Sequence, residues 1–311
     1  MKKFFKVLVV AFFCFILVKG TGTYIFVHSV DGKEASHSEN VKTDPIDSTK
    51  NERVNVLILG VDAKDSKSAQ KARTDTMMLA TFDIKEKKID IISIPRDTRT
   101  VISGRKKKEK INHAHAYGGV DLSVKTVKDF LSVPVNYYVK INYKGLSKII
   151  DDLGGVEVDV PMDMKYYDPY AKPPLKINLK KGRQILDSDK AMQFVRFRKG
   201  YKNQDLGRIG AQHAFLEALA KKMMQPQTIL KLPTLVKTFK TYVQTDIPIF
   251  KMTSYAMSAK EINMEDIHMY TVPGEARMID KISYYIPNMD KTQKMLDEIF
   301  KIKESKENTN Q

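Results

Sequence analysis

The chain has 311 residues and a formal net charge of +16, with 42% hydrophobic and 29% charged residues. This balance is typical of a globular protein with a sizeable core and argues against wholesale disorder, while the charge favours anionic partners such as phospholipid, wall polymer or nucleic acid. The only cysteine, Cys14, lies in an apolar N-terminal run, which excludes disulfides, thiol nucleophiles and cysteine-ligated zinc from the rest of the chain.

The N-terminus carries a basic stretch followed by an apolar one. Two lysines precede the apolar residues, which extend from Phe4 to Val27 with Lys6 and Lys19 between them. If Lys19 reaches the interface, this length suffices for a membrane span, and the positive-inside rule leaves the N-terminus in the cytoplasm. A cleaved signal peptide ending near Gly20 and Gly22 is the alternative. We expect the uncleaved anchor, in a single-pass protein of the cell membrane whose folded domain is extracytoplasmic.

The composition predicts four regions, which are an anchor (1–27), a polar linker (28–52), a folded domain (53–303) and a polar tail (304–311). The folded domain opens with a near-continuous apolar run over 54–61, as in a buried strand. The stretches 77–84 and 88–94 flank a charged turn and predict a hairpin.

Helical and extended patterns then alternate. We expect a helix over 121–131 with Asp121 as its N-cap, strands over 136–142 and 156–160, and between them a helix that ends at Gly154. Residues 164–175 are rich in Pro and Tyr and look irregular, and 177–186 reads as a turn between two extended pieces. Later helices are expected over 188–197, 205–224, 229–243 (interrupted by Pro233) and 289–302, with a strand at 267–274. The interleaving predicts an α/β domain with a mixed central sheet covered on both faces.

Arginines and aspartates gather at the ends of these predicted elements. Guanidinium groups bind phosphate oxygens in pairs, and carboxylates hold the divalent metals that phosphates also bind. The pattern therefore predicts a phosphate-ester or pyrophosphate site. Its candidate residues are Arg73, Asp75, Arg96, Arg196, Arg198, Asp205, Arg208 and Gln212.

A helix is expected to begin near residue 205. Asp205, Arg208 and Gln212 would share one face of that helix, next to N-terminal amides that favour an anion. A short glycine-containing connection would bring Arg196 and Arg198 close to them. The alternative is an ordinary surface ion pair between Asp205 and Arg208.

Two aspartates stand at neighbouring strand ends. Asp62 follows the first strand and Asp75 opens the second, so together they could hold one Mg²⁺, although each could simply cap a turn. Arg73 would share the side of Asp75 on an extended strand. Zinc bound by His113 and His115 is not expected, because their spacing differs from that of helical zinc pairs.

Two further stretches leave alternatives open. The helices over 214–239 are rich in Leu, Met, Ile and Phe, and would be either plain core or the wall of an apolar tunnel for a lipid tail. The basic run RKKKEK at 105–110 is expected to be a solvated or polyanion-facing loop. No aromatic residues interleave its lysines, so we expect no nucleic-acid partner.

The motifs, taken in order, resemble the LytR–CpsA–Psr family over residues 54–224, through NVLILGVDA, RTDTMMLATFD, IISIPRDTR, KINHAHAYGG, DDLGGVEVDV, VRFRK and DLGRIGAQ. The resemblance implies a three-layer α/β/α domain with a hydrophobic tunnel for a polyprenyl chain. It also implies a phosphotransferase that moves a teichoic acid or capsule-like glycopolymer from its polyprenyl-pyrophosphate carrier to a muramic-acid hydroxyl of peptidoglycan, releasing polyprenyl phosphate. One departure is LDSDKAM, where the family typically shows LDG.

The resemblance also assigns roles to the candidate residues. It implies Mg²⁺ bound by Asp62 and Asp75, and a donor pyrophosphate bound by Arg73, Arg96, Arg196, Arg198 and Arg208, with Gln212 nearby and Lys125 as a weaker contact. Arg96, Arg198, Asp205 and Arg208 are expected to be catalytic, with Asp205 orienting the arginines or activating the acceptor. A hydrolase of the same lipid conjugates, a membrane-bound regulator and a wall-polymer binding protein remain as alternatives.

Overall fold

The computed structural model describes residues 41, 43–45, 53–61, 72–170, 174–201, 204–223, 225–248, 251, 255, 262 and 266–300. The predicted anchor and tail lie outside these residues. Within the described part of the chain, no helix is long and apolar enough to cross a membrane.

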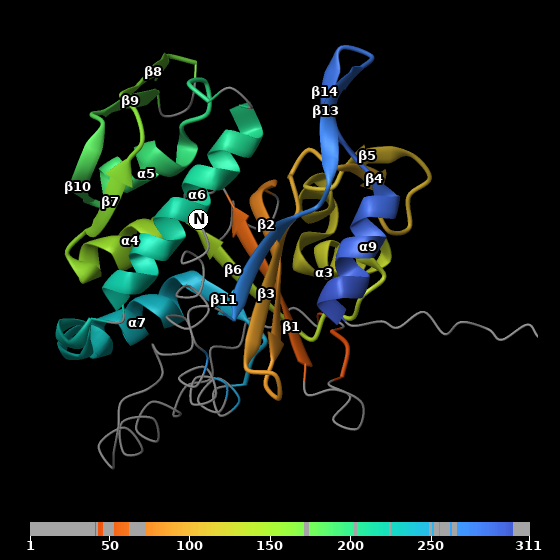
Figure 1. Ribbon diagram of the computed structural model, residues 1–311, viewed down its shortest axis with the longest axis horizontal. Coiled ribbons are helices and arrows are strands. Elements are labelled where there is room, and N and C mark those ends of the chain that lie inside the picture. The colour runs from red at the N-terminus through yellow and green to blue at the C-terminus, as the bar shows by residue number, and fades with distance from the viewer. Residues whose placement is uncertain are drawn as a thin grey trace, which may run out of the picture.

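A mixed six-stranded sheet forms the centre of the domain, in the order β11–β6–β1–β2–β3–β12 (Figure 1). Its strands are β1 (Arg53–Val61), β2 (Thr74–Asp83), β3 (Lys88–Ser93), β6 (Tyr137–Asn142), β11 (Val243–Thr245) and β12 (Ile267–Thr271). β1 pairs antiparallel with β2 and parallel with β6, and β3 pairs antiparallel with β2 and parallel with β12. The predicted mixed sheet and its β2–β3 hairpin are therefore confirmed.

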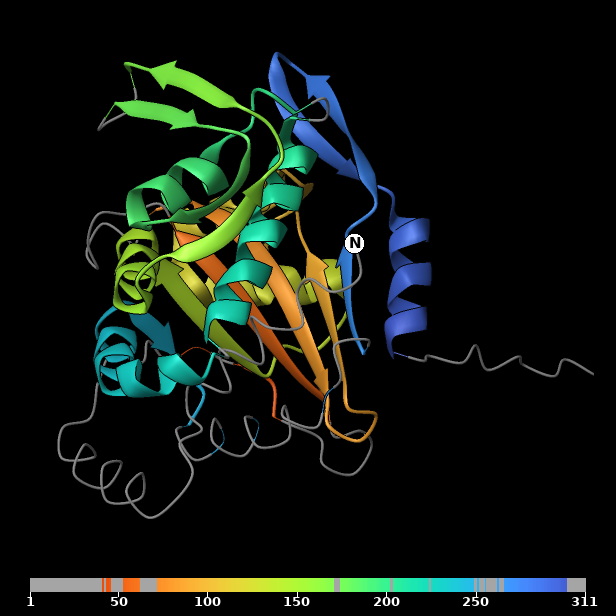
Figure 2. The ribbon, with the colours of Figure 1, turned by 60° about the vertical axis from the view of Figure 1, so that its left-hand side comes forward.

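Helices cover both faces of this sheet (Figure 2). On one face, Leu57 and Leu59 of β1 pack against α3 (His113–Leu131) and α9 (Met289–Phe300). On the other face lie α4 (Tyr143–Leu153), α5 (Ser188–Arg196), α6 (Gln204–Met223) and α7 (Leu232–Tyr242), preceded by the short helix η2 (Pro226–Lys231). Because both faces are covered, the central strands read as continuous apolar runs rather than alternating ones.

Among the described residues, four two-stranded ladders accompany the central sheet. They pair β10 (Gly182–Leu186) with β7 (Val156–Val160), β8 (Met164–Asp168) with β9 (Leu175–Leu179), β4 (Arg99–Val101) with β5 (Lys108–Lys110), and β13 (Gly274–Ile279) with β14 (Ile282–Pro287). The stretch expected to be irregular thus contains β8, and the two extended pieces expected after it pair with other strands rather than with each other.

Two helix boundaries differ from the expectation. α3 begins at His113 after Asn112, not at Asp121, because a kink at Gly118 and Gly119 joins two helical segments. Pro233 lies in the first turn of α7, where its missing N–H costs no hydrogen bond, so it begins that helix instead of interrupting one.

Gly145 brings two helices on the same face into close contact. A Cβ at this position would lie 2.7 Å from Cβ of Tyr242, so only glycine lets α4 approach α7 this closely. The two helices thereby form part of one wall over the sheet.

Candidate functional site

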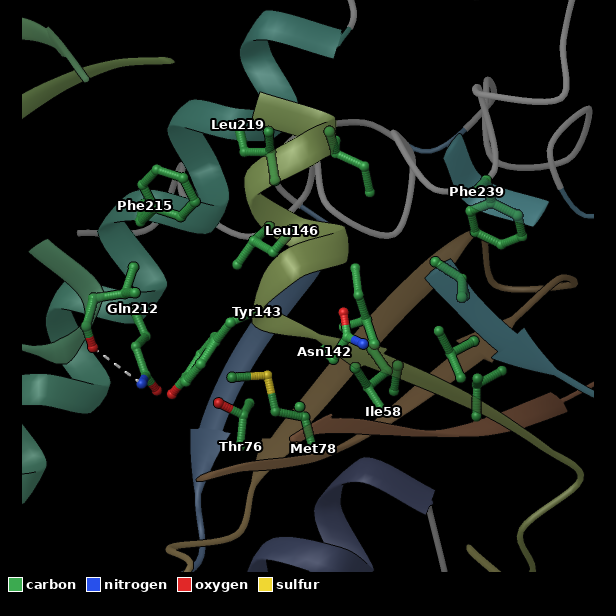
Figure 3. Close-up of a pocket in the computed structure, with 18 of the residues that line it drawn as sticks. Ile58, Thr76, Met78, Asn142, Tyr143, Leu146, Gln212, Phe215, Leu219 and Phe239 are labelled. Atoms are coloured by element: carbon green, nitrogen blue, oxygen red, sulfur yellow. Dashed lines mark hydrogen bonds between the residues drawn. The ribbon is translucent and has the colours of Figure 1, made fainter. Parts of the chain in front are cut away.

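An apolar cavity of about 190 Å³ lies between the central sheet and the helices of one face (Figure 3). Its floor is formed by β1, β2 and β6 and its walls by α4, α6 and α7, through residues such as Ile58, Met78, Leu146, Phe215, Leu219 and Phe239. These residues line a space that suits a hydrocarbon chain. The helices expected to be either core or tunnel wall do both, since Phe215 and Leu219 are buried in the core and also face the cavity.

One end of the cavity is polar. Thr76, Asn142, Tyr143 and Gln212 line it, and Gln212 and Tyr143 point toward each other there, while Phe239 stands at the other end (Figure 3). Thr76 and Gln212 also border a small recess formed with Asp75, Arg96 and Arg208. The apolar cavity therefore opens onto a cluster of two arginines and one carboxylate.

A β-bulge places Asp75 in this cluster. Gly60 of β1 pairs with Thr76 and the next residue, Val61, pairs with Thr74, so Asp75 is an extra residue in β2. Such a bulge breaks the alternation of side chains and turns the extra residue away from its expected side. The prediction that Arg73 and Asp75 share a side rested on that alternation. In the structure Arg73 precedes β2 and its side chain is exposed.

Both carboxylate oxygens of Asp75 accept hydrogen bonds. Arg96 Nη1 donates to Oδ1, and Tyr143 Oη donates to Oδ2 at 3.0 Å. The Arg196 guanidinium lies over the ring of Tyr143, 5.6 Å from its centroid. Arg96 also faces Asp97, whose other oxygen binds Lys110 Nζ at 2.7 Å. The segments that contain Asp75, Arg96 and Tyr143 are far apart in sequence and meet at the Asp75 carboxylate.

Arg208 and Gln212 reach the same place from α6. Both are largely buried, with 6% and 9% of their surface exposed, and Gln212 Nε2 donates to the carbonyl of Val195 at 3.3 Å. That bond fixes the amide at the junction of the cavity and the arginine cluster. Arg208 thereby places a guanidinium, whose planar fork matches phosphate oxygens, at the recess.

The remaining predicted residues lie in different places. Arg198 is exposed beyond the end of α5, and Lys125 is exposed on α3, which covers the opposite face of the sheet. Asp205 is in the first turn of α6, but its side chain lies outside the described residues, as does Asp62. The structure therefore brings together Asp75, Arg96, Arg196, Arg208 and Gln212 from the predicted set.

Sequence reasoning missed Tyr143 and the pair formed by Ser93 and His213. Ser93 borders the arginine recess, and its Oγ lies 2.9 Å from His213 Nε2. Burial lowers the pKa of His213 to about 4, so this imidazole is neutral at neutral pH. The signal for Tyr143 was its position directly after a predicted strand, where α/β folds place ligand groups.

Asp75 has the chemistry of a Mg²⁺ ligand. Each of its oxygens accepts one hydrogen bond and keeps a further lone pair, and Mg²⁺ is often held by one or two carboxylates with water and phosphate oxygens. Among the residues that the structure describes, no three His, Cys, Asp or Glu side chains form a metal-binding group. Asp75 thus fits the open type of site, in which the substrate supplies most ligands.

The chain is similar in sequence to a known protein family over most of its length. The family model of the LytR_cpsA_psr family matches residues 22–301. The protein named polyisoprenyl-teichoic acid–peptidoglycan teichoic acid transferase TagU from Bacillus licheniformis is 30% identical over 289 residues, covering 91% of this chain and 90% of the relative. Its namesake from Bacillus mycoides is 34% identical over 263 residues, covering 83% and 81%.

Solved structures show the same fold. The crystal structure of Bacillus subtilis TagV superposes with a TM-score of 0.66 at 30% identity and covers 80% of this chain and 97% of that one. The structure of TagT bound to LI-WTA superposes with a TM-score of 0.64 at 29% identity and covers 84% and 94%.

Proposed function

The chain belongs to the LytR–CpsA–Psr family, and on that basis we propose that it is a polyisoprenyl-teichoic acid–peptidoglycan teichoic acid transferase. One observation carries this proposal: an apolar cavity ends at a cluster of buried or half-buried arginines around Asp75. A lipid-linked pyrophosphate has this polarity, with a hydrocarbon chain on one side and a doubly charged group at its end. The polyisoprenyl chain would lie between Phe239 and Thr76, and its pyrophosphate beside Arg96 and Arg208.

In the reaction, an acceptor hydroxyl of peptidoglycan, which we take to be that of muramic acid, loses its proton to water, and its oxygen bonds to the phosphorus that carries the glycopolymer. The bond from that phosphorus to the oxygen of polyprenyl phosphate breaks, and the released lipid phosphate keeps its chain in the cavity. Phosphoryl transfer is catalysed mainly by positioning and by neutralising charge on the phosphate oxygens. Arg96 and Arg208 supply that charge, and Gln212 orients the group at the mouth of the cavity.

Tyr143 and Arg196 support the same group from the α4 side. The hydroxyl of Tyr143 donates to the Asp75 carboxylate while its ring contacts the Arg196 guanidinium, so Tyr143 links Arg196 to the carboxylate that borders the recess. Asp75, together with Asp62, would hold Mg²⁺, which when bound neutralises pyrophosphate charge. Arg73, Arg198 and Lys125 are exposed. In this proposal, Arg73 and Arg198 contact the pyrophosphate of the bound donor.

We further propose that residues 1–27 anchor the protein in the cell membrane, with the domain on the extracytoplasmic side. The support is the apolar stretch from Phe4 to Val27 behind two lysines. This placement brings the cavity to a membrane-embedded donor. Digestion of the domain by external protease in cells whose wall has been removed would support it, and protection of the domain would contradict it.

The transferase proposal is tested with the full chain in detergent micelles, a polyprenyl-pyrophosphate-linked glycopolymer and a peptidoglycan oligomer. Mass spectrometry should find a glycopolymer–phosphate–muropeptide adduct that requires Mg²⁺ and is lost in Arg208→Ala. The control is Arg183→Ala, which removes an exposed arginine paired with Glu157 and should leave the yield unchanged. Free sugar phosphate without an adduct would indicate a hydrolase. Binding without any turnover would leave a polymer-binding protein.

A further inference from the structure

The β4–β5 hairpin carries a dense group of exposed cations that the transferase site does not use. Residues 105–110 contain five cations and one carboxylate, and Lys106, Lys107 and Lys108 are all exposed. Within the described residues, the ion pairs of the hairpin join Arg105 to Glu109 and Lys110 to Asp97, and none involves these three lysines. Clustered like charges repel one another, and an anionic partner relieves that repulsion.

The single carboxylate of this run is already occupied. Glu109 accepts hydrogen bonds from Tyr117 Oη at 2.6 Å and from Arg105 Nε at 3.0 Å. The hydrogen bond from Tyr117 is the main cause that lowers the pKa of Glu109, so the carboxylate stays ionised. Its negative charge is neutralised by Arg105, with which it forms an ion pair. The Arg105 guanidinium also stacks on the Tyr117 ring, 4.2 Å from its centroid. Glu109 therefore fixes Arg105 in place but leaves the three lysines uncompensated.

Hydrogen bonds and an ion pair join the hairpin to the polar site. The Asn112 amide N–H donates to the carbonyl of Arg96 at 3.3 Å, and Asn112 Nδ2 donates to the carbonyl of Thr74 at 3.2 Å. One acceptor belongs to Arg96 itself and the other to Thr74, which precedes Asp75, so Asn112 is bonded beside the pair at the centre of the site. Lys110, at the end of β5, binds Asp97 beside Arg96. Cations thus continue from Arg96 through Lys110 to the tip of the hairpin.

The hairpin and the lipid cavity extend from opposite sides of this polar site. The cavity follows β2 from Thr76 to Phe82, a length of roughly 20 Å at about 3.4 Å per residue. The hairpin is attached at the other end, next to Thr74. A donor with its lipid in the cavity and its pyrophosphate beside Arg96 therefore projects the rest of its glycopolymer toward the hairpin, away from the lipid.

We propose that the hairpin cations Arg105, Lys106, Lys107, Lys108 and Lys110 bind the phosphodiester-linked anionic polymer of the donor as it leaves the pyrophosphate site. This hairpin track rests on the proposed function for its direction, but its ligand chemistry follows from the charges alone. It would make the chain favour long anionic polymers over a short neutral glycan on the same lipid carrier.

The test is a fluorescence-anisotropy titration of the full chain in detergent with soluble poly(glycerol phosphate). The triple variant Lys106→Gln, Lys107→Gln, Lys108→Gln should bind about tenfold more weakly at low salt, with a shallower salt dependence, because three exposed ion pairs are lost. The control is Lys85→Gln, Lys237→Gln, Lys240→Gln, which removes the same charge from exposed sites on the β2–β3 turn and α7. Its affinity should stay within about twofold of the unchanged chain.

Equal weakening in both triple variants would mean that only net charge matters and would overturn the track, as would no weakening in either. Loss of binding to phosphatidylglycerol vesicles but not to the polymer would assign the hairpin to the membrane instead. A second readout compares kcat/KM for donors carrying a long anionic polymer and a single neutral disaccharide, and that ratio should fall about tenfold in the hairpin variant. If the unchanged chain turns over neither donor, the transferase proposal fails. The titration would still test whether the hairpin cations bind an anionic polymer.

Discussion

Replacing Tyr143 by phenylalanine isolates one hydrogen bond of the site. The change removes the donor to Asp75 Oδ2, at 3.0 Å, but keeps the ring that lines the cavity and carries Arg196. A hydrogen bond to a charged group contributes about 1.5–3 kcal/mol. The Asp75 side chain is 17% exposed, so water can partly replace the lost donor and the lower end of this range applies.

The expected result is therefore a fall in kcat/KM of roughly tenfold, since about 1.4 kcal/mol corresponds to a factor of ten. The reason is positional: without the hydroxyl, the Asp75 carboxylate can rotate and the Arg96 guanidinium moves with it. The assay is the initial rate of adduct formation in detergent with varied lipid-linked donor. The free energy of unfolding in urea should fall by less than the roughly 1.4 kcal/mol lost in activity, because the bond lies at a partly exposed site rather than in the core.

Tyr166→Phe is a matched control. Its hydroxyl also donates to an aspartate, Asp168 at 3.4 Å, and a cation, Lys199 Nζ, lies 4.7 Å from its ring centroid. It lines neither the cavity nor the arginine recess, so its kcat/KM should stay within about twofold of the unchanged chain. An equal loss in both variants, or no loss in Tyr143→Phe, would refute the positional role of Tyr143.

Three further predictions follow from the same geometry. Arg208→Lys keeps the charge but loses the planar fork, so kcat/KM should fall about 100-fold in the adduct assay, and a loss below threefold would contradict a direct phosphate contact. Leu219→Trp should fill the cavity and raise KM for donors with long lipid chains far more than for a short-chain donor, and an equal effect on both would separate the cavity from lipid binding. His115 is fully buried, and burial lowers its pKa from 6.5 to about 4. Because the unfolded chain binds this proton first, stability should fall as pH drops from 6.5 to 4, by about 1.2 kcal/mol per pH unit near pH 5. His213 has the same lowered pKa, so His115→Gln should remove only the His115 share of the slope in urea unfolding at pH 7.5 and 5 and leave the share of His213. An unchanged slope would contradict the burial argument.

The central sheet could be predicted because its strands are apolar on both faces, which leaves a strong signal in sequence. β1 extends over Arg53–Val61 against a prediction of 54–61. The β13–β14 hairpin could not be predicted in the same way. Most of its residues, such as Met278 and Ile282, are exposed, so no buried face imposes an alternating pattern.

The site was predictable only in part. Arginines at strand and helix ends pointed to an anion, and the helical spacing of Arg208 and Gln212 placed them on one face, as the structure has them. The Tyr143 contact depends on the parallel pairing of β1 with β6, which joins residues far apart in sequence. Arg198 was predicted to join the cluster from its place in the sequence motif, but the motif does not indicate how exposed the side chain is, and in the structure Arg198 is exposed.

The bulge at Asp75 links the lipid cavity to the anion site. Along β2, Thr76 and Met78 face the cavity while Met77 faces the α3 layer, so regular alternation would direct position 75 to the side of Met77. The extra residue between the partners of Gly60 and Val61 reverses this, and Asp75 meets Tyr143 instead. One strand thereby supplies both the floor of the hydrocarbon cavity and the carboxylate at its mouth. The proposed substrate likewise joins a hydrocarbon chain directly to a pyrophosphate. The bulge in β2 therefore determines where the charged end of that substrate binds relative to its lipid chain.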